Sequence, residues 1–166
     1  LSAIEILKRE YGREVTLDQV TSFNLRESFG LTWMEYDHFF DLIHRPEEIL
    51  SLEPVHGAIQ VLRSWAGKGH QIAIITGRLT CAYEASLEWL CMHRVPYNSF
   101  IMVDKYSRPQ TDHNIAISME ELSVRRFSLA VEDSLSVAEY LSRGTAKKVA
   151  LFDRPWNRFR SVNGNM

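Results

Sequence analysis

From Pro54 onward, short apolar runs rich in β-branched residues alternate with longer stretches whose apolar residues recur at helical spacing. The apolar runs cover residues 70–75, 99–103, 127–131 and 149–152. Such runs are typical of parallel strands buried on both faces. Helices are expected between and before them, over 55–65, 81–92, 118–122 and 135–142. The alternation therefore predicts an α/β fold, with a Rossmann-like parallel sheet and helices on both of its faces.

Residues 1–53 follow a different pattern, which is rich in aromatic residues and has no convincing strand. Helices are expected over 1–11, 32–43 and 45–50, and a short helix is expected after Thr16, with Gln19 at its third position. We therefore interpret 1–53 as a small helical domain and 54–166 as the α/β domain.

Composition narrows the classes of function. Lysine and arginine number 19 against 21 acidic residues, and a formal net charge of −2 excludes a nucleic-acid binder that acts through bulk positive charge. No apolar run reaches the roughly 18 residues that would span a bilayer. Cys81 and Cys91 would lie about 15 Å apart on one helix, too far for a disulfide, and we expect them to be buried. Two unpaired thiols indicate a reducing compartment, the cytoplasm.

Polar groups follow three of the expected strands at their carboxyl ends, where sites gather in parallel sheets. The first strand is followed by Thr76-Gly77-Arg78, the second by Asp104-Lys105, and the third by Glu132-Asp133-Ser134. A hydroxyl and the N–H groups of a glycine turn can bind phosphate oxygens, and a lysine can neutralise charge that develops during transfer. A pair of carboxylates can bind Mg²⁺. Together these groups predict phosphoryl chemistry.

Each group also has a structural interpretation. Thr76-Gly77 can be a turn that caps a helix, Lys105 can be a solvated loop residue, and Glu132-Asp133 can be acids placed at the positive end of a helix. The guanidinium of Arg78 can pair with phosphate or with a nearby acid.

With these motifs in this order, the chain resembles the haloacid dehalogenase superfamily of phosphohydrolases, and within it the 5'(3')-deoxyribonucleotidase branch of cytosolic type C and its nucleotidase-like relatives. The resemblance rests on Ile74-Ile75-Thr76-Gly77-Arg78, on Lys105 and on Val131-Glu132-Asp133-Ser134. Ser22-Phe23-Asn24-Leu25 and the stretch from Leu151 to Arg158, which contains Asp-Arg-Pro-Trp-Asn, also match that branch. The resemblance covers nearly the whole chain.

The resemblance implies a Mg²⁺-dependent phosphomonoesterase acting on nucleoside monophosphates through an aspartyl-phosphate. Thr76, Gly77 and Arg78 would bind the phosphate, Lys105 would stabilise charge, and Asp133 with Glu132 would hold Mg²⁺. Residues 1–53 would be a cap over the site, and the residues expected to face the substrate are Phe23, Asn24, Trp33 and Phe39. The alternative for these aromatic residues is packing within the helical domain.

One motif of the superfamily is absent. Its first strand carries Asp-x-Asp, whose first Asp is the nucleophile and whose second is the general acid and base; the printed sequence has no Asp-x-Asp. We expect this strand, central in the sheet, in a segment upstream of Leu1. The alternative is a catalytically silent relative that binds a phosphorylated ligand or a protein partner. A Rossmann dinucleotide enzyme is disfavoured, because no strand is followed by Gly-x-Gly-x-x-Gly.

Overall fold

The computed structural model describes residues 2–158, so Leu1, the first residue of the helix expected over 1–11, lies outside the described residues. The chain packs as two compact units. One unit is formed by Leu42–Leu122, and the other joins Leu1–Asp41 to Ser123–Met166. The expected division between 1–53 and 54–166 stays a prediction.

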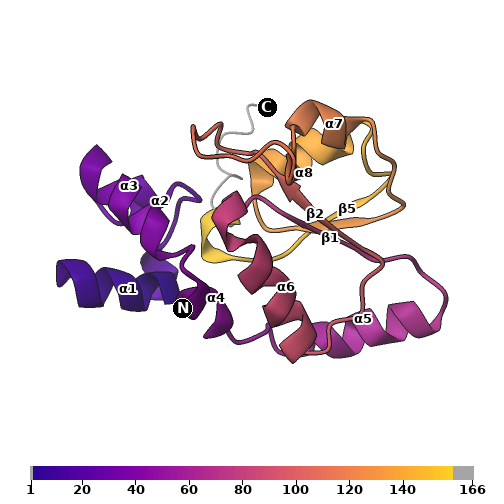
Figure 1. The fold of residues 1–166 in the computed structure, drawn as a ribbon, viewed down its shortest axis with the longest axis horizontal. Helices are drawn as coiled ribbons and strands as arrows, with labels where there is room; N and C mark the ends of the chain where they lie inside the picture. The colour runs from indigo at the N-terminus through magenta and orange to yellow at the C-terminus, as the bar shows by residue number, and fades with distance from the viewer. Residues whose placement is uncertain (1, 159–166) are drawn as a thin grey trace, which may run out of the picture. The chain divides into compact units, whose positions relative to one another are not determined.

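The unit Leu42–Leu122 contains a three-stranded parallel sheet in the order β1-β2-β3. Its elements are α4 (Pro46–Leu50), α5 (Ala58–Gly67), β1 (Ala73–Thr76), η2 (Thr80–Ala82), α6 (Tyr83–Met92), β2 (Ser99–Val103) and β3 (Ala116–Ile117), and α7 (Met119–Ser123) begins at its end. β1 and β2 run side by side (Figure 1), in a register that pairs Ala73 with Ser99 and Thr76 with Met102. The residues that follow β1 and β2 therefore emerge at the same edge of the sheet.

Helices α4 and α6 pack against each other in this unit. Ile49 of α4 is buried with Ala82 and Ala85, and Trp89 packs against this cluster. The indole Nε1 of Trp89 donates a hydrogen bond to the carbonyl of Leu52 at 2.7 Å, which ties the segment after α4 to α6.

The second unit combines the N-terminal helices with a two-stranded parallel sheet, β4-β5. Its elements are α1 (Ser2–Tyr11), η1 (Leu17–Gln19), α2 (Leu25–Ser28), α3 (Trp33–Leu42), β4 (Ala130–Glu132), α8 (Leu135–Ser142), β5 (Val149–Leu151) and η3 (Pro155–Asn157). α8 packs against both strands. The short helix η1 lies beside η3, so that residues far apart in the sequence meet.

An aromatic cluster holds the N-terminal helices together. The side chain of Phe39 on α3 is fully buried, with its ring centroid 5.5 Å from that of Phe29 and 6.3 Å from that of Tyr11 on α1. The rings of Phe29 and Phe39 meet edge to face, a favourable geometry, and those of Tyr11 on α1 and Phe39 on α3 are tilted at 58° to each other. The interpretation of Phe39 as a substrate-facing residue is wrong, because its ring is used in this core.

Hydrogen bonds at the first turn of α3 and of η1 explain where these two helices begin. The carboxylate of Glu35 accepts from the N–H of Thr32 at 2.8 Å, and the N–H of Glu35 donates to the Thr32 hydroxyl at 3.2 Å, a capping box at the start of α3. Arg13 adds an ion pair to Glu35 at 2.9 Å. Before η1, the side-chain oxygen of Gln19 accepts from the N–H of Thr16 at 2.8 Å, as the sequence predicts.

The mixed α/β class with parallel strands is confirmed, and the structure differs from the sequence prediction in the bounds of some elements. The strand expected over 70–75 begins at Ala73, because the N–H of Ile72 donates to the side chain of Asn98 at 2.7 Å and not to a strand. The strand expected over 127–131 begins at Ala130, and Phe127 forms only an isolated bridge to Ala146.

The strands are also less buried than their composition predicts. Val131 on β4 is 53% exposed and Ile75 on β1 is 37% exposed. Among the described residues, β1 and β4 each pair with a single neighbouring strand. A sheet of two or three strands covers less of each strand than a larger continuous sheet, which explains the exposure.

The expected burial of the two cysteines is wrong. Cys81 lies in η2 and Cys91 on α6, and both side chains are exposed. Their apolar neighbours Ala82 and Leu90 face the interior instead. The spacing of apolar residues predicts the helix correctly, but a small side chain such as cysteine does not by itself show which side of the helix is buried.

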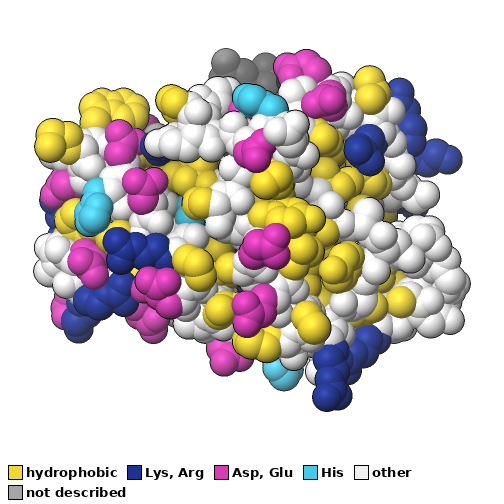
Figure 2. All heavy atoms as spheres, viewed as in Figure 1, with side chains coloured by type: hydrophobic (Ala, Val, Ile, Leu, Met, Phe, Trp, Pro, Cys, Tyr) yellow, Lys and Arg dark blue, Asp and Glu magenta, His cyan; other side chains and the backbone are white. Residues whose placement is uncertain are grey.

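Acidic and basic side chains are nearly equal in number, and they are mixed on the surface (Figure 2). On the face shown in Figure 2, acidic and basic side chains are intermixed over the region of α1 to α3. Among residues 2–158, no helix has the length and apolar character needed to cross a membrane.

The aromatic cluster gives a test of stability. Phe39→Ala should lower the free energy of unfolding by about 3–5 kcal/mol, because it empties a fully buried position. Met34→Ala, on the same helix at a side chain that is 85% exposed, should change it little. Urea denaturation measures both, and equal values for the two variants would contradict this account of the core.

The capping box gives a test of pH dependence. Hydrogen bonds from Thr32, together with the charge of Arg13, lower the pKa of Glu35 below its ordinary value of 4.5. A lowered pKa in the folded state stabilises the protein above the unfolded-state pKa, and this contribution is lost as pH falls through the folded-state pKa. Glu35→Gln should therefore be less stable than the wild type at neutral pH, and the difference should shrink as the pH falls below 4.5. Urea denaturation across this pH range, with Glu88→Gln on α6 as control, checks it.

Candidate active site

Thr76 is the last residue of β1, and its side chain shapes the turn that follows. The hydroxyl oxygen of Thr76 accepts a hydrogen bond from the backbone N–H of Arg78 at 3.3 Å. A hydroxyl that accepts one bond still carries a proton that it can donate. The turn thus presents a donor at the carboxyl end of β1.

Gly77 lies directly against the side chain of Lys105, which follows β2. A Cβ built on Gly77 would lie 3.2 Å from both Cβ and Cδ of Lys105. A contact this short would force the lysine chain to shift, so glycine lets the two strand ends approach. The Thr76-Gly77 turn and the stem of Lys105 are thereby brought together.

The side chain of Arg78 is largely buried, and its described hydrogen-bond partner is an uncharged hydroxyl. Its Nη1 donates to the hydroxyl of Ser86 at 3.1 Å, and Ser86 itself is only 1% exposed. Burial lowers the pKa of the Arg78 guanidinium. Within residues 2–158 no carboxylate forms an ion pair with Arg78, so the acid partner that the sequence left open is not found there. A guanidinium in this state favours an anion beside it.

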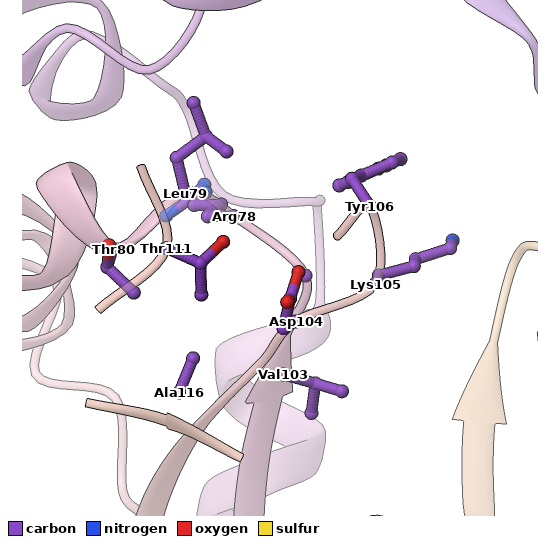
Figure 3. A pocket seen from close by; sticks show the side chains of 10 residues that line it. Arg78, Leu79, Thr80, Val103, Asp104, Lys105, Tyr106, Thr111 and Ala116 are labelled. Carbon is purple, nitrogen blue, oxygen red and sulfur yellow. The ribbon is translucent and has the colours of Figure 1, made fainter. Parts of the chain in front are cut away.

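A small pocket lies between these two strand ends, and Figure 3 shows its lining. Asp104 stands at the end of β2 in this pocket, and its carboxylate accepts from the N–H of Ser107 at 2.8 Å, which orders the loop after the strand. Lys105 and Tyr106 also line the pocket, and Figure 3 shows the ends of their side chains directed away from Asp104 and Thr111. The ammonium of Lys105 lies 5.8 Å from the ring centroid of Tyr106.

The acidic pair lies in the other unit, between β4 and α8. Glu132 ends β4 and Ser134 is the N-cap of α8, so Asp133 occupies the turn between them. One carboxylate oxygen of Glu132 accepts from the N–H of Ser134 at 2.9 Å. The carbonyl of Asp133 accepts from the indole Nε1 of Trp156 at 3.1 Å and from the side-chain amide of Asn157 at 3.0 Å.

The donor set of this turn suits a hard cation. Two adjacent carboxylates offer oxygen ligands, and Mg²⁺ commonly binds through one or two carboxylates while keeping several waters. Among the described residues there is no group of three or more His, Cys, Asp or Glu side chains arranged to hold a metal ion.

Phe23 and Asn24 belong to the same unit as the acidic pair. The ring of Phe23 meets that of Trp156 edge to face, with centroids 6.4 Å apart, so Phe23 reaches the residue that holds Asp133. Asn24 is the N-cap of α2, and its side-chain oxygen accepts from the N–H of Arg26 at 3.1 Å. A binding role for either residue stays a prediction.

The structure thus brings Thr76, Gly77, Arg78 and Lys105 together in one unit, and Glu132, Asp133 and Phe23 in the other. Sequence reasoning missed Ser86 as the partner of Arg78, and no local pattern marks it. It also missed the hydrogen bonds of Asn157 and Trp156 to Asp133, although both residues belong to the Asp-Arg-Pro-Trp-Asn stretch that carries the resemblance.

Two comparisons with known proteins give matches over most of the chain. The family described as "5' nucleotidase, deoxy (Pyrimidine), cytosolic type C protein" matches residues 2–159. A curated protein of Halalkalibacterium halodurans, named "Putative nucleotidase", is 23% identical over 152 residues, which span 92% of this chain and 72% of that protein. No solved structure matches the chain.

The Arg78–Ser86 contact can be tested by stability. Ser86→Ala should lower the free energy of unfolding by about 1–3 kcal/mol, since it leaves a withdrawn guanidinium without its described partner. Ser51→Ala, which removes an exposed hydroxyl bonded to the carbonyl of Glu48, is the control and should change stability less. Urea denaturation of both variants makes the comparison, and a Ser86→Ala protein as stable as the wild type would contradict the assigned contact.

Proposed function

The chain belongs to the cytosolic type C 5'-nucleotidase family of the haloacid dehalogenase superfamily, and on that premise we propose that it is a Mg²⁺-dependent phosphomonoesterase acting on nucleoside or deoxynucleoside monophosphates in the cytoplasm. The observation that carries the proposal is the close approach of Gly77 and Lys105 at the ends of β1 and β2. This approach puts a hydroxyl, a glycine turn and a lysine side chain at adjacent strand ends, and together they suit a phosphate group.

Each residue of that set has a role in the proposal. The hydroxyl of Thr76 and the N–H of Gly77 donate to phosphate oxygens, and Arg78 supplies a positive charge that no carboxylate neutralises within the described residues. Lys105 stabilises the charge that develops as phosphate is transferred. Phe23 and Asn24 are assigned as substrate-binding residues. They belong to residues 1–53, which we propose to be the cap of the 54–166 domain.

Asp133 and Glu132 are the residues that would hold Mg²⁺, because they form the adjacent oxygen donors of the turn after β4. Mg²⁺ bound there would supply positive charge to neutralise phosphate oxygens. Since one oxygen of Glu132 already accepts from the N–H of Ser134, Asp133 is assigned as the main ligand and Glu132 as the supporting one.

The proposal also needs a nucleophile. In the first step the aspartate carboxylate attacks phosphorus, the ester P–O bond breaks, and the nucleoside leaves with a proton from the general acid. Water then attacks the aspartyl-phosphate, which releases inorganic phosphate and regenerates the aspartate. The printed sequence contains no Asp-x-Asp pair, so the proposal assigns the nucleophile and the general acid to a strand in a segment preceding Leu1 of the parent chain.

Asp133→Asn tests the metal assignment. In the parent chain carrying the upstream segment, this substitution should lower Mg²⁺-dependent phosphate release from nucleoside monophosphates at least about 100-fold, because it removes the charge of the main ligand. Asp41→Asn, an exposed side chain on α3, is the matched control and should keep wild-type turnover. Phosphate release is measured for a panel of nucleotides with and without Mg²⁺.

Two outcomes would overturn the proposal. Unchanged turnover in Asp133→Asn would remove the metal assignment. Binding of nucleoside monophosphates without turnover of any of them by the parent chain would favour the alternative, a catalytically silent relative that binds a phosphorylated ligand.

A further inference from the structure

The peptide group that joins Asp133 to Ser134 is held at both of its polar atoms. Its carbonyl oxygen accepts from the side chains of Trp156 at 3.1 Å and Asn157 at 3.0 Å. Its N–H, on Ser134, donates to the carboxylate of Glu132 at 2.9 Å. Because the peptide group is planar, fixing its carbonyl also fixes the direction of the Ser134 N–H. The position at which this N–H binds the carboxylate of Glu132 is thereby fixed as well.

Asn157 is itself held in place by the segment after β5. Its side-chain oxygen accepts from the N–H of Arg154 at 3.1 Å, and its amide nitrogen donates to the carbonyl of Phe152 at 2.8 Å as well as to that of Asp133. Both donors of the amide are thus used. The N–H of Phe152 donates to the carbonyl of Glu132 at 2.7 Å, so the two strand ends are tied at a second point.

Trp156 adds a contact to the N-terminal segment. The ring of Phe23 packs edge to face on the indole that bonds Asp133, and η1 lies beside η3. This packing restrains the indole, so that its Nε1 stays directed at one carbonyl.

We propose that Trp156 and Asn157 are positioning residues for the Glu132–Asp133 pair, and that they set the orientation in which this pair binds a divalent cation. The inference rests on the proposed function, because it takes the pair to be a Mg²⁺ site. Mg²⁺ demands near-ideal octahedral geometry, so its affinity is sensitive to carboxylate direction. Residues that orient metal ligands without touching the metal typically change affinity 10–100-fold when they are replaced.

The test measures metal binding directly in the purified parent chain, with Mn²⁺ as a spin probe and Mg²⁺ as competitor. Asn157→Asp keeps the shape of the side chain but replaces its two N–H donors with oxygen, and it should weaken Mn²⁺ binding about 10-fold or more. Trp156→Phe removes the Nε1–H donor and keeps a ring beside Phe23, and it should weaken binding several-fold. Circular dichroism and urea denaturation show that the variants are folded.

Asp153→Asn is the matched control. Asp153 lies in the same segment and pairs with Arg158 at 2.8 Å, but its side chain makes no described bond to Asp133. Its substitution should leave the Mn²⁺ dissociation constant at the wild-type value. An equal weakening in Asp153→Asn would show that the segment acts only through general stability and would overturn the proposal.

The remaining outcomes separate this inference from the proposed function. If the wild type binds Mn²⁺ and Asp133→Asn does not, but folded Asn157→Asp and Trp156→Phe bind as tightly as the wild type, the positioning role is overturned and the metal site stands. If the wild type itself binds neither Mn²⁺ nor Mg²⁺, the metal assignment in the proposed function and this inference both fall. Should Asn157→Asp not fold, the milder Trp156→Phe decides the question alone.

Discussion

The parallel pairing of β1 with β2 is the constraint on which one half of the candidate site depends. In the register that pairs Thr76 with Met102, β1 and β2 end at the same edge of the sheet. Gly77, in the turn after β1, therefore meets Lys105, which follows β2. The contact between Gly77 and Lys105 is then steric, since any side chain at position 77 would displace the lysine stem. The parallel register of the two strands thus places the glycine turn after Thr76 against the aliphatic stem of Lys105.

The second unit orders its acidic turn by a different means. No steric contact of this kind is needed at Asp133, because hydrogen bonds hold the backbone from both sides. Hydrogen bonds to a peptide group fix its orientation more strictly than packing does, since they depend on angle as well as distance. Steric exclusion suits a glycine turn that must admit a ligand, whereas directional bonds suit carboxylates that must meet the geometry of a cation.

The sequence predicts those helices and strands that are long enough to show a regular spacing of apolar residues. Helices with clear apolar spacing, such as α3 and α6, and the strand β2 occur where expected. Elements too short to show a period, α2 and β3, were missed. The residues at the strand ends could be named because strand ends collect sites in parallel sheets. The pairing of Ser86 with Arg78 and of Asn157 with Asp133 could not be predicted, because the tertiary fold brings these residues together.

The fully used side chain of Asn157 has a consequence for the chemical ageing of the protein. Asparagine is a thermolabile residue, and its deamidation yields a carboxylate of nearly the same shape. At most surface positions that change adds one negative charge to a solvated side chain. At Asn157 it would turn two carbonyl oxygens, those of Phe152 and Asp133, from acceptors of a hydrogen bond into neighbours of an anion. The three hydrogen bonds that immobilise this amide also restrain it from the motion that deamidation requires. The order of the acidic turn is therefore tied to the chemical integrity of one amide group.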